Sequence, residues 1–396
     1  MRSAYSLHIP APDPYLTSVE PGTPCGELLR RYWHPVCRSE DLRDVPKPVR
    51  ILGEDLVAFR DGAGRAGLLF FRCSHRGASL EYGRVEERGL RCCYHGWLYD
   101  TVGRVLDMPL EPPDSGFKGR IEHPCYPVRE FGGLVFAYMG PQDRMPELPL
   151  YDVWLREGGR LSSRVGPRTG GSTDCNWLQS QENLMDALHT MWLHTAHSGP
   201  QFPSDLYGIP PEVAYEETEM GMRFVMSRPL PDGRQWRVIW EVLMPFTTHL
   251  VYVDAPLADR PGEISEKVRS VAFCIPLDDT HQLGARLEWV PDVPEPARGR
   301  TRDALAPGGR ADRSDEYAQR HPDDKEATEA QGPIAIHGLE HLASSDRGVI
   351  MFRKILRREI EKVAAGCDPK GVIRDPQIGR GIPTSAGSYI SPRPRP

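Results

Sequence analysis

The pattern of hydrophobic and polar positions divides the chain into two parts with different periods. In the first part, short apolar runs alternate with glycine-containing turns. Residues 49–60 are predicted to be two strands around a Gly53-Glu54-Asp55 turn, and Leu134–Tyr138 to be a closing strand. Short strands bounded by such turns are typical of small antiparallel sheets. The pattern therefore predicts a mostly β module from about residue 30 to residue 145.

From residue 173 onward the period becomes helical. The segment NWLQSQENLMDALHTMWLH (176–194) is predicted to be a helix, with Thr173 or Asp174 as its N-cap. Helix is expected again at 324–340 and 347–365. The strand-like segments between them are Met222–Met226, Trp236–Met244, His249–Asp254, Val268–Pro276 and Gln282–Val290. This order predicts an α+β domain, of the helix-grip type, with helices flanking one face of a central antiparallel sheet.

Shifts in composition give the expected domain boundaries. We predict an N-terminal arm (1–29), an all-β domain (30–148), the α+β domain (149–375) and a Pro/Arg-rich flexible tail (376–396). Residues 292–323 are rich in Pro, Arg, Asp and Gly, and we expect a loop or a partly disordered insert there.

Composition and charge narrow the class of protein. The 396 residues are 39% hydrophobic and carry a formal net charge of −6, which gives no reason to expect nucleic acid or an anionic membrane as a partner. The first residues lack the pattern of a signal peptide, and no apolar run approaches the roughly 20 residues of a membrane span. Nine cysteines without a regular framework favour a reducing, cytoplasmic setting.

Two cysteine–histidine motifs are the most informative feature of the first domain. Cys73 and His75 form a C-x-H pair, and Cys92 and His95 form a C-x-x-H pair. One iron of a [2Fe–2S] cluster can bind both cysteines and the other both histidines, which is the Rieske arrangement. The same ligand set can bind structural zinc. The neighbouring small and aromatic residues favour the cluster, because they let backbone N–H groups turn toward the sulfides.

Cys93 introduces a local ambiguity, because Cys93 and His95 are also a C-x-H pair. We prefer Cys92 as the ligand, since its longer spacing lets the loop turn between the two ligands. Cys93 is then expected to be a small buried residue.

A second candidate metal site lies on the helix that follows the first domain. It has the pattern Asn183-x-x-Asp186-x-x-His189-x4-His194. Two histidines and one carboxylate form the facial triad of non-haem Fe(II) sites. His189 and His194 are about 140° apart around an ideal helix, so the helix must bend or bulge between them. Asp186 lies between them and is predicted to accept the second N–H of one ligand histidine. Polar surface residues are the alternative, but apolar residues surround the pair.

The residues alone leave the carboxylate ligand open. The candidates are Asp323, Asp324, Asp346 and Asp186. Asp346 precedes a predicted helix, where N-capping is the simpler interpretation. Asp324 begins a helical segment, where a solvated carboxylate of the first turn would look similar.

These motifs resemble those of the oxygenase (α) subunit of Rieske non-haem iron oxygenases. CSHRGASLEYG and CCYHGWLYDTVGRVLDMP are similar to the family's cluster loops, and ENLMDALHTMWLH to its iron helix. QGPIAIHGLEHLASSDRGVIMFRKIL is similar to the phthalate dioxygenase-like branch, which includes O-demethylases. The resemblance covers roughly residues 25–365. Two departures, Thr328 and the insert at 294–323, lie near the expected pocket entrance.

The resemblance implies a role for each site residue. His189 and His194 match the family's iron ligands, and Asp324 with Glu329 reproduces its D-x4-E pattern, which makes Asp324 the third ligand. Asp186 matches a bridging carboxylate, and Asn183 a neighbouring Asn.

The resemblance also implies a function and partners. It implies a terminal oxygenase that uses O₂ and external electrons to hydroxylate an aromatic substrate, with an aromatic carboxylate favoured. O-demethylation of an aryl methyl ether is the alternative, and a Rieske electron carrier a remote one. The family forms rings of three, or a multiple, in which His95, Asp186 and His189 connect two subunits. Because no nucleotide-binding glycine motif or plant-type ferredoxin run is present, a separate NAD(P)H-dependent reductase is implied, with or without a ferredoxin.

Overall fold

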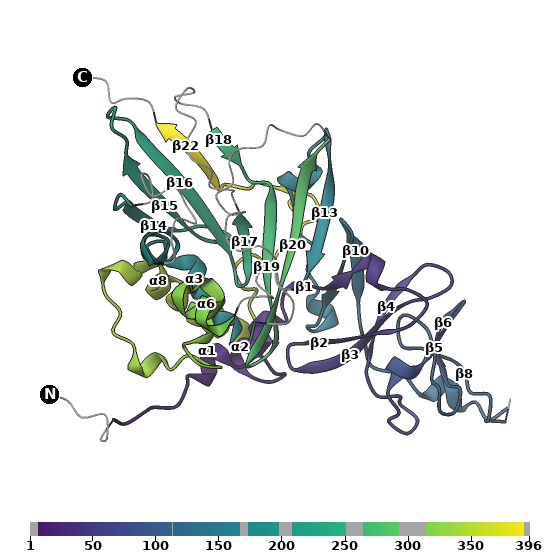
Figure 1. The fold of residues 1–396 in the computed structure, drawn as a ribbon. Helices are drawn as coiled ribbons and strands as arrows, with labels where there is room; N and C mark the ends of the chain where they lie inside the picture. The colour runs from purple at the N-terminus through teal and green to yellow at the C-terminus, as the bar shows by residue number, and fades with distance from the viewer. Residues whose placement is uncertain are drawn as a thin grey trace.

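The computed structural model describes residues 7–112, 114–166, 173–197, 208–250, 264–292 and 314–391. A smaller, all-β region lies on the right of Figure 1, and a larger region with a long sheet and most of the helices lies on the left. This is the predicted α+β architecture, with the β module first in the chain.

Three small antiparallel sheets build the β region. The first has the order β1(Trp33–Arg38)-β11(Leu134–Tyr138)-β10(Val128–Phe131), and the second β2(Lys47–Ile51)-β3(Glu54–Arg60)-β4(Ala66–Phe70)-β9(Cys125–Tyr126). The third has the order β5(Arg84–Glu86)-β6(Gly89–Arg91)-β7(Leu98–Tyr99)-β8(Val105–Asp107). The predicted hairpin at 49–60 is confirmed as β2 and β3. The turn, however, is Leu52-Gly53 and not Gly53-Glu54-Asp55, because Glu54 and Asp55 belong to β3. Leu52 and Gly53 adopt φ of 50° and 79°, a conformation suited to a two-residue hairpin loop.

A nine-stranded antiparallel sheet forms the centre of the larger region. Its main path is β13(Gly159–Val165)-β20(His281–Pro291)-β19(Ser270–Asp278)-β17(Thr247–Leu250)-β16(Gln235–Leu243)-β15(Gly221–Pro229)-β14(Glu212–Glu217). β18(Ile264–Lys267) lies off this path. All five predicted strands of this region have a counterpart, although residues 251–254 of the third lie outside the described ranges.

The helices pack on one face of this sheet, and the β region on the other. α3(Trp177–Met185) contacts β19, where the Cys274 thiol donates to the Trp177 carbonyl at 3.5 Å. α8(Arg347–Ala364) contacts α3 and β15, and one side of it is buried. On the opposite face, Phe273 packs against Phe136 of β11, with ring centroids 5.9 Å apart. The short helices α1(Pro14–Thr17) and α2(Pro24–Leu29) of the predicted arm also pack against α8.

The helix limits differ from the prediction in three places. The N-cap of α3 is Asn176, whose side chain accepts the Leu178 N–H at 3.1 Å, and not Thr173 or Asp174. The helix expected at 324–340 ends early as α7(Asp324–Glu329), because Gly332 adopts φ 97° and Pro333 follows. The predicted loop at 292–323 contains the helix α6(Asp315–Arg320), while its residues 293–313 lie outside the described ranges.

The prediction of a flexible tail from residue 376 is wrong over residues 380–391. β21(Arg380–Ile382) pairs with β12(Leu150–Tyr151), and β22(Gly387–Ser391) pairs with β16 and β18. Trp236 of β16 donates its indole N–H to the Ser388 hydroxyl at 2.8 Å, and Ser388 and Ile390 are buried. The proline- and arginine-rich composition belongs mainly to residues 392–396, which lie outside the described ranges.

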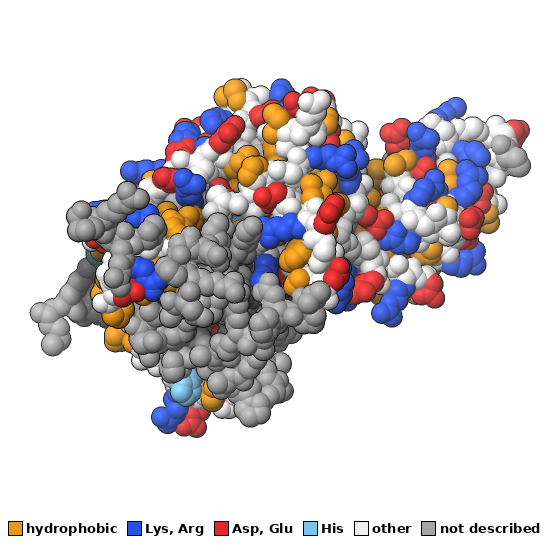
Figure 2. Space-filling view, turned by 90° about the horizontal axis from the view of Figure 1, so that it is seen from above, with side chains coloured by type: hydrophobic (Ala, Val, Ile, Leu, Met, Phe, Trp, Pro, Cys, Tyr) orange, Lys and Arg blue, Asp and Glu red, His pale blue; other side chains and the backbone are white. Residues whose placement is uncertain are grey.

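The described surface shows mixed charge. On the face in Figure 2, Lys and Arg side chains are interspersed with Asp and Glu among the described residues, and no field of one sign is visible there. Among the described helices, none combines the length and apolar character that a membrane span requires.

Candidate functional sites

Two loops of the β region share one turn design and carry the cysteine–histidine motifs. In the first, the Cys73 carbonyl accepts the Gly77 N–H at 2.9 Å; in the second, the Cys92 carbonyl accepts the Gly96 N–H at 3.2 Å. The N–H of each cysteine is also bonded, to Ala78 and Trp97 respectively. Both glycines adopt positive φ, 72° and 75°, which residues with a Cβ rarely do.

The two loops place the two cysteine sulfurs next to each other and the two histidine rings next to each other. Cys73 and Cys92 are buried, and the Cys73 thiol donates a hydrogen bond to the Cys92 sulfur, which lowers the pKa of Cys92 to about 6. The rings of His75 and His95 lie 4.4 Å apart at their centroids, and His75 stacks on Trp97 at 4.7 Å. His75 is exposed and His95 partly so. The two sulfurs therefore lie at the buried base of the paired loops, and the two imidazoles lie at their exposed tip.

The arrangement fits a two-iron cluster better than zinc. The donor atoms around one tetrahedral ion lie within about 4 Å of one another. Among the described residues, no three of these four side chains bring their donor atoms within 4.8 Å of one another. The backbone N–H of His75 donates to the Cys73 sulfur, and those of Tyr94 and His95 to the Cys92 sulfur. Donors aimed at the sulfurs are typical of iron–sulfur sites.

Cys93 and Tyr99 differ from what the sequence suggested. Cys93 is exposed rather than buried, and this outward position leaves Cys92 as the cysteine that faces Cys73. Tyr99, which sequence reasoning missed, is buried with its hydroxyl 3.0 Å from the Cys73 sulfur. Its place two residues after the packing aromatic Trp97 was the only signal in the sequence.

The helix that carries the second motif is broken, as its spacing required. α3 ends at Met185, and Asp186 is its C-cap. The Asp186 carboxylate accepts the N–H groups of Leu188 at 3.0 Å and His189 at 3.2 Å. A short α-turn, α4(His189–Met191), leads directly into a π-helix over Trp192–His197. The predicted bulge between His189 and His194 is thus confirmed. Such π-segments are frequent at functional sites.

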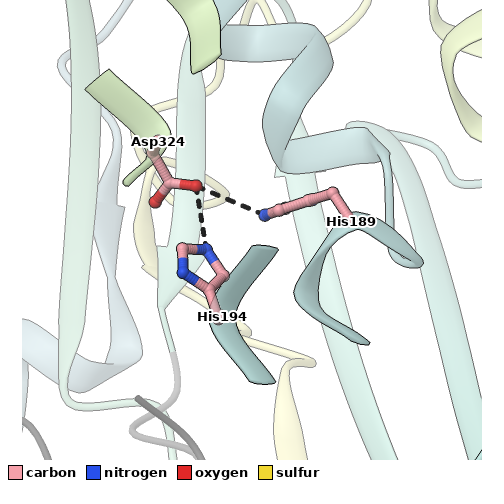
Figure 3. Close-up of side chains that lie close together, drawn as sticks. All are labelled: His189, His194 and Asp324. Carbon is pink, nitrogen blue, oxygen red and sulfur yellow. Dashed lines mark hydrogen bonds and ion pairs between the residues drawn. The ribbon is translucent and has the colours of Figure 1, made fainter. Parts of the chain in front are cut away.

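His189, His194 and Asp324 meet at one point. Figure 3 shows the Asp324 carboxylate between the two imidazoles, with one oxygen 3.4 Å from Nε2 of His189 and 2.9 Å from Nε2 of His194. Their ligand atoms all lie within 4.8 Å of one another. Asn183 donates its amide N–H to the same Asp324 oxygen at 3.2 Å. Two imidazoles and one carboxylate at this separation suit a facial triad.

Asp324 and His189 stabilise one another's charged forms. Burial works to raise the pKa of Asp324, but hydrogen bonds from His189 and His194 hold that pKa well below its usual range. Burial works to lower the pKa of His189, but the Asp324 carboxylate outweighs it and the pKa lies above its usual range. The carboxylate is therefore ionised at neutral pH, as a metal ligand must be.

The other aspartates of the sequence prediction have different contacts. His189 donates its Nδ1–H to the backbone carbonyl of Asp186 at 2.5 Å, and not to the carboxylate as expected. Asp323, considered above only as a rival ligand, is buried with its carboxylate 3.8 Å from Nδ1 of His194. Asp346 accepts the Ala343 N–H and lies outside the group. A carbonyl and a carboxylate behind the two rings are the kind of support that orients ligand histidines.

A groove runs beside Asp186. It has a volume of about 430 Å³ and is lined by Asn183, Asp186, Leu339 and Leu342 among others. Glu182 and Glu340 also line it, and with His337 they form a second group of possible ligands. Arg353 is hydrogen-bonded to both carboxylates, at 2.7 and 2.9 Å, so the group is an ion-pair cluster rather than a metal site.

The two sites lie on opposite sides of the molecule in Figure 1. In Figure 1 the cysteine–histidine loops adjoin β4 and β6 on the right, whereas α3 lies on the left among the other helices.

Comparison with known proteins identifies close relatives. Residues 32–129 match the model of the Rieske [2Fe-2S] domain. The phenoxybenzoate dioxygenase subunit alpha of Ectopseudomonas oleovorans is 42% identical, over 93% of this chain and 90% of the relative. The tert-butanol monooxygenase / tert-amyl alcohol desaturase oxygenase subunit of Aquincola tertiaricarbonis is 41% identical, over 95% of this chain and 82% of the relative.

Solved structures support the fold. A variant of NdmA from Pseudomonas putida CBB5, crystallised with caffeine, superimposes with a TM-score of 0.61. The match covers 87% of this chain and 94% of that chain at 22% identity.

Proposed function

Because the chain belongs to the Rieske non-haem iron oxygenases, as an oxygenase (α) subunit, we propose that it hydroxylates an aromatic carboxylate. In this proposal Cys73, His75, Cys92 and His95 bind the [2Fe–2S] cluster. The mononuclear iron is bound by His189, His194 and Asp324. The observation that carries the iron assignment is the convergence of these three side chains, from two separate helical segments, on one point.

The two metal groups supply different chemistry when bound: the cluster carries single electrons, and the mononuclear iron binds and reduces O₂. The chain's own residues orient the ligands. Asn183 fixes the Asp324 oxygen, the Asp186 carbonyl fixes the His189 ring, and Asp323 faces the far side of His194.

We further propose a ring of three subunits, or a multiple of it, in which the cluster of one subunit serves the iron of the next. His95 would face Asp186 of the neighbouring subunit, and Asp186 continues to His189. Three features support this. The cysteine–histidine loops and α3 lie on opposite sides of the molecule in Figure 1, His75 at the tip of the loops is exposed, and a groove borders Asp186. A head-to-tail interface closes into a ring of this kind.

The substrate proposal rests on the phenoxybenzoate dioxygenase relative, and O-demethylation of an aryl methyl ether is the alternative within the same ligand set. The tert-butanol monooxygenase relative adds small branched alcohols as a competing class. Electrons would come from a separate NAD(P)H-dependent reductase, with or without a ferredoxin, in a cytoplasmic setting.

The test is to measure iron and acid-labile sulfide per chain, followed by EPR of the dithionite-reduced protein and turnover. We expect about three irons and two sulfides with a Rieske-type signal. With a surrogate reductase, an oxygenated product should form from 3-phenoxybenzoate or phthalate faster than from anisole derivatives or tert-butanol. Two irons that do not increase on addition of Fe(II) would contradict the iron assignment. Preference for tert-butanol would contradict the substrate class alone.

A further inference from the structure

A histidine that belongs to neither motif lies behind the cysteine–histidine loops. His123 precedes β9, and its side chain is buried, with 2% of the residue exposed. Both ring nitrogens have partners. The Phe70 carbonyl is 2.9 Å from Nε2, so Nε2 carries the proton and donates it. Nδ1 is therefore an acceptor, and it accepts the Ser74 hydroxyl at 2.8 Å.

These two bonds span Cys73. Phe70 is the last residue of β4, before the cysteine, and Ser74 follows the cysteine directly. The His123 imidazole thus links the end of β4 to Ser74, on the other side of Cys73. The same ring packs on Tyr99, with centroids 4.4 Å apart and planes at 34°. Tyr99 in turn holds its hydroxyl 3.0 Å from the Cys73 sulfur. The His123 side chain therefore contacts the Tyr99 ring and is hydrogen-bonded to Phe70 and Ser74, the residues that flank Cys73.

We propose that His123 is a positioning residue that keeps the Cys73 sulfur against the Tyr99 hydroxyl and thereby sets the reduction potential of the cluster. This rests on the cluster ligands of the proposed function. Reduction adds negative charge to the cluster, and hydrogen bonds to the ligand sulfurs stabilise that charge. If the loop is released, the Tyr99–Cys73 bond weakens and the potential falls.

The first test is His123→Phe in the full-length protein, with the midpoint potential measured by redox titration followed by EPR. Phenylalanine keeps a ring against Tyr99 but removes both hydrogen bonds. We expect a lower potential with iron and sulfide content unchanged. His123→Gln, whose amide can donate to Phe70 and accept from Ser74, should restore most of the wild-type value.

His34 offers a matched control. It is equally buried, its Nε2 lies 2.9 Å from the Leu29 carbonyl, and it stacks on an aromatic ring, but it lies on β1 in a different sheet. His34→Phe should leave the potential unchanged. A shift in His34→Phe equal to that in His123→Phe would indicate a general effect of disturbing the core and overturn the proposal.

A double-mutant cycle separates positioning from mere structural support. Tyr99→Phe should lower the potential, and His123→Phe should have no further effect in that background. Two independent, additive decreases would overturn the proposal. If His123→Phe fails to retain the cluster, Ser74→Ala removes only one of the two bonds and should lower the potential by a smaller amount. An unchanged potential in a cluster-containing Ser74→Ala protein would also overturn it. Absence of a cluster from the wild-type protein would instead refute the ligand assignment itself.

Discussion

The two candidate metal sites are built in opposite ways. The four cysteine and histidine side chains come from residues 73–95, on two loops with the same turn. The proposed iron triad consists of residues 189, 194 and 324, so one proposed ligand comes from a helix far along the chain. A local site depends on turn geometry, which short motifs specify. A non-local site depends on how helices pack, which short motifs do not specify.

The supporting contacts differ in the same way. Each cluster loop is closed by backbone hydrogen bonds to a glycine with positive φ. The triad is also held by contacts between side chains: Asn183 donates to the Asp324 carboxylate, and Arg353 of α8 bonds to Glu182 of α3. We therefore expect substitutions near the cluster to act locally, and substitutions near the iron to act across helices.

The largest expected effect comes from Cys92→Ser. It should remove the cluster, with about two irons and both sulfides, and abolish turnover. Cys93→Ser is the matched control, because Cys93 is exposed and its neighbour faces Cys73. Iron and sulfide analysis with EPR distinguishes them. Loss of the cluster from Cys93→Ser alone would show that the loop presents the other cysteine.

Asp324→Ala should remove about one iron per chain, leave the sulfide content unchanged and reduce turnover at least ~100-fold. Asp346→Ala is the control, since Asp346 accepts only a backbone N–H nearby and lies outside the triad. If Asp346→Ala loses the iron and Asp324→Ala does not, the assignment of Asp324 as the carboxylate ligand is incorrect.

Asp186→Asn tests the connection between the two sites. The amide oxygen can still accept the N–H groups of Leu188 and His189, so both metals should remain while the lost charge slows turnover roughly 10–100-fold. Asp186→Ala also removes the acceptor and should cost about 1 kcal/mol of stability by thermal unfolding. Unchanged turnover in a fully loaded Asp186→Asn protein would refute the bridge.

The smallest effect is expected from Asn183→Ala. It removes one hydrogen bond, of 3.2 Å, to the Asp324 oxygen and leaves all three ligands in place. Iron affinity should fall about tenfold, measured by titrating the iron-depleted protein with Fe(II). Equal affinity for the variant and the wild type would mean that α7 alone fixes the carboxylate.

The sequence predicted the local features well. Alternation and turn residues identified the β2–β3 hairpin and the long strands, and the five-residue spacing of the histidines identified the break in the helix. The prediction of a flexible tail was wrong because a strand as short as β22 leaves no clear signal in the composition. β22 is ordered by its pairing with β16, which lies far away in the sequence. Asp323 and His123 could not be assigned, because their roles depend on contacts with residues far away in the sequence.

The position of β22 sets an order of assembly during synthesis. β22 contains the last described residues and pairs with both β16 and β18. The nine-stranded sheet is therefore incomplete until residue 391 has left the ribosome. The sheets around the cysteine–histidine loops are finished by β11, roughly 250 residues earlier. At ribosomal speed this interval is on the order of 10–50 s. The nascent chain thus has time to acquire its cluster before the iron-binding half has finished folding.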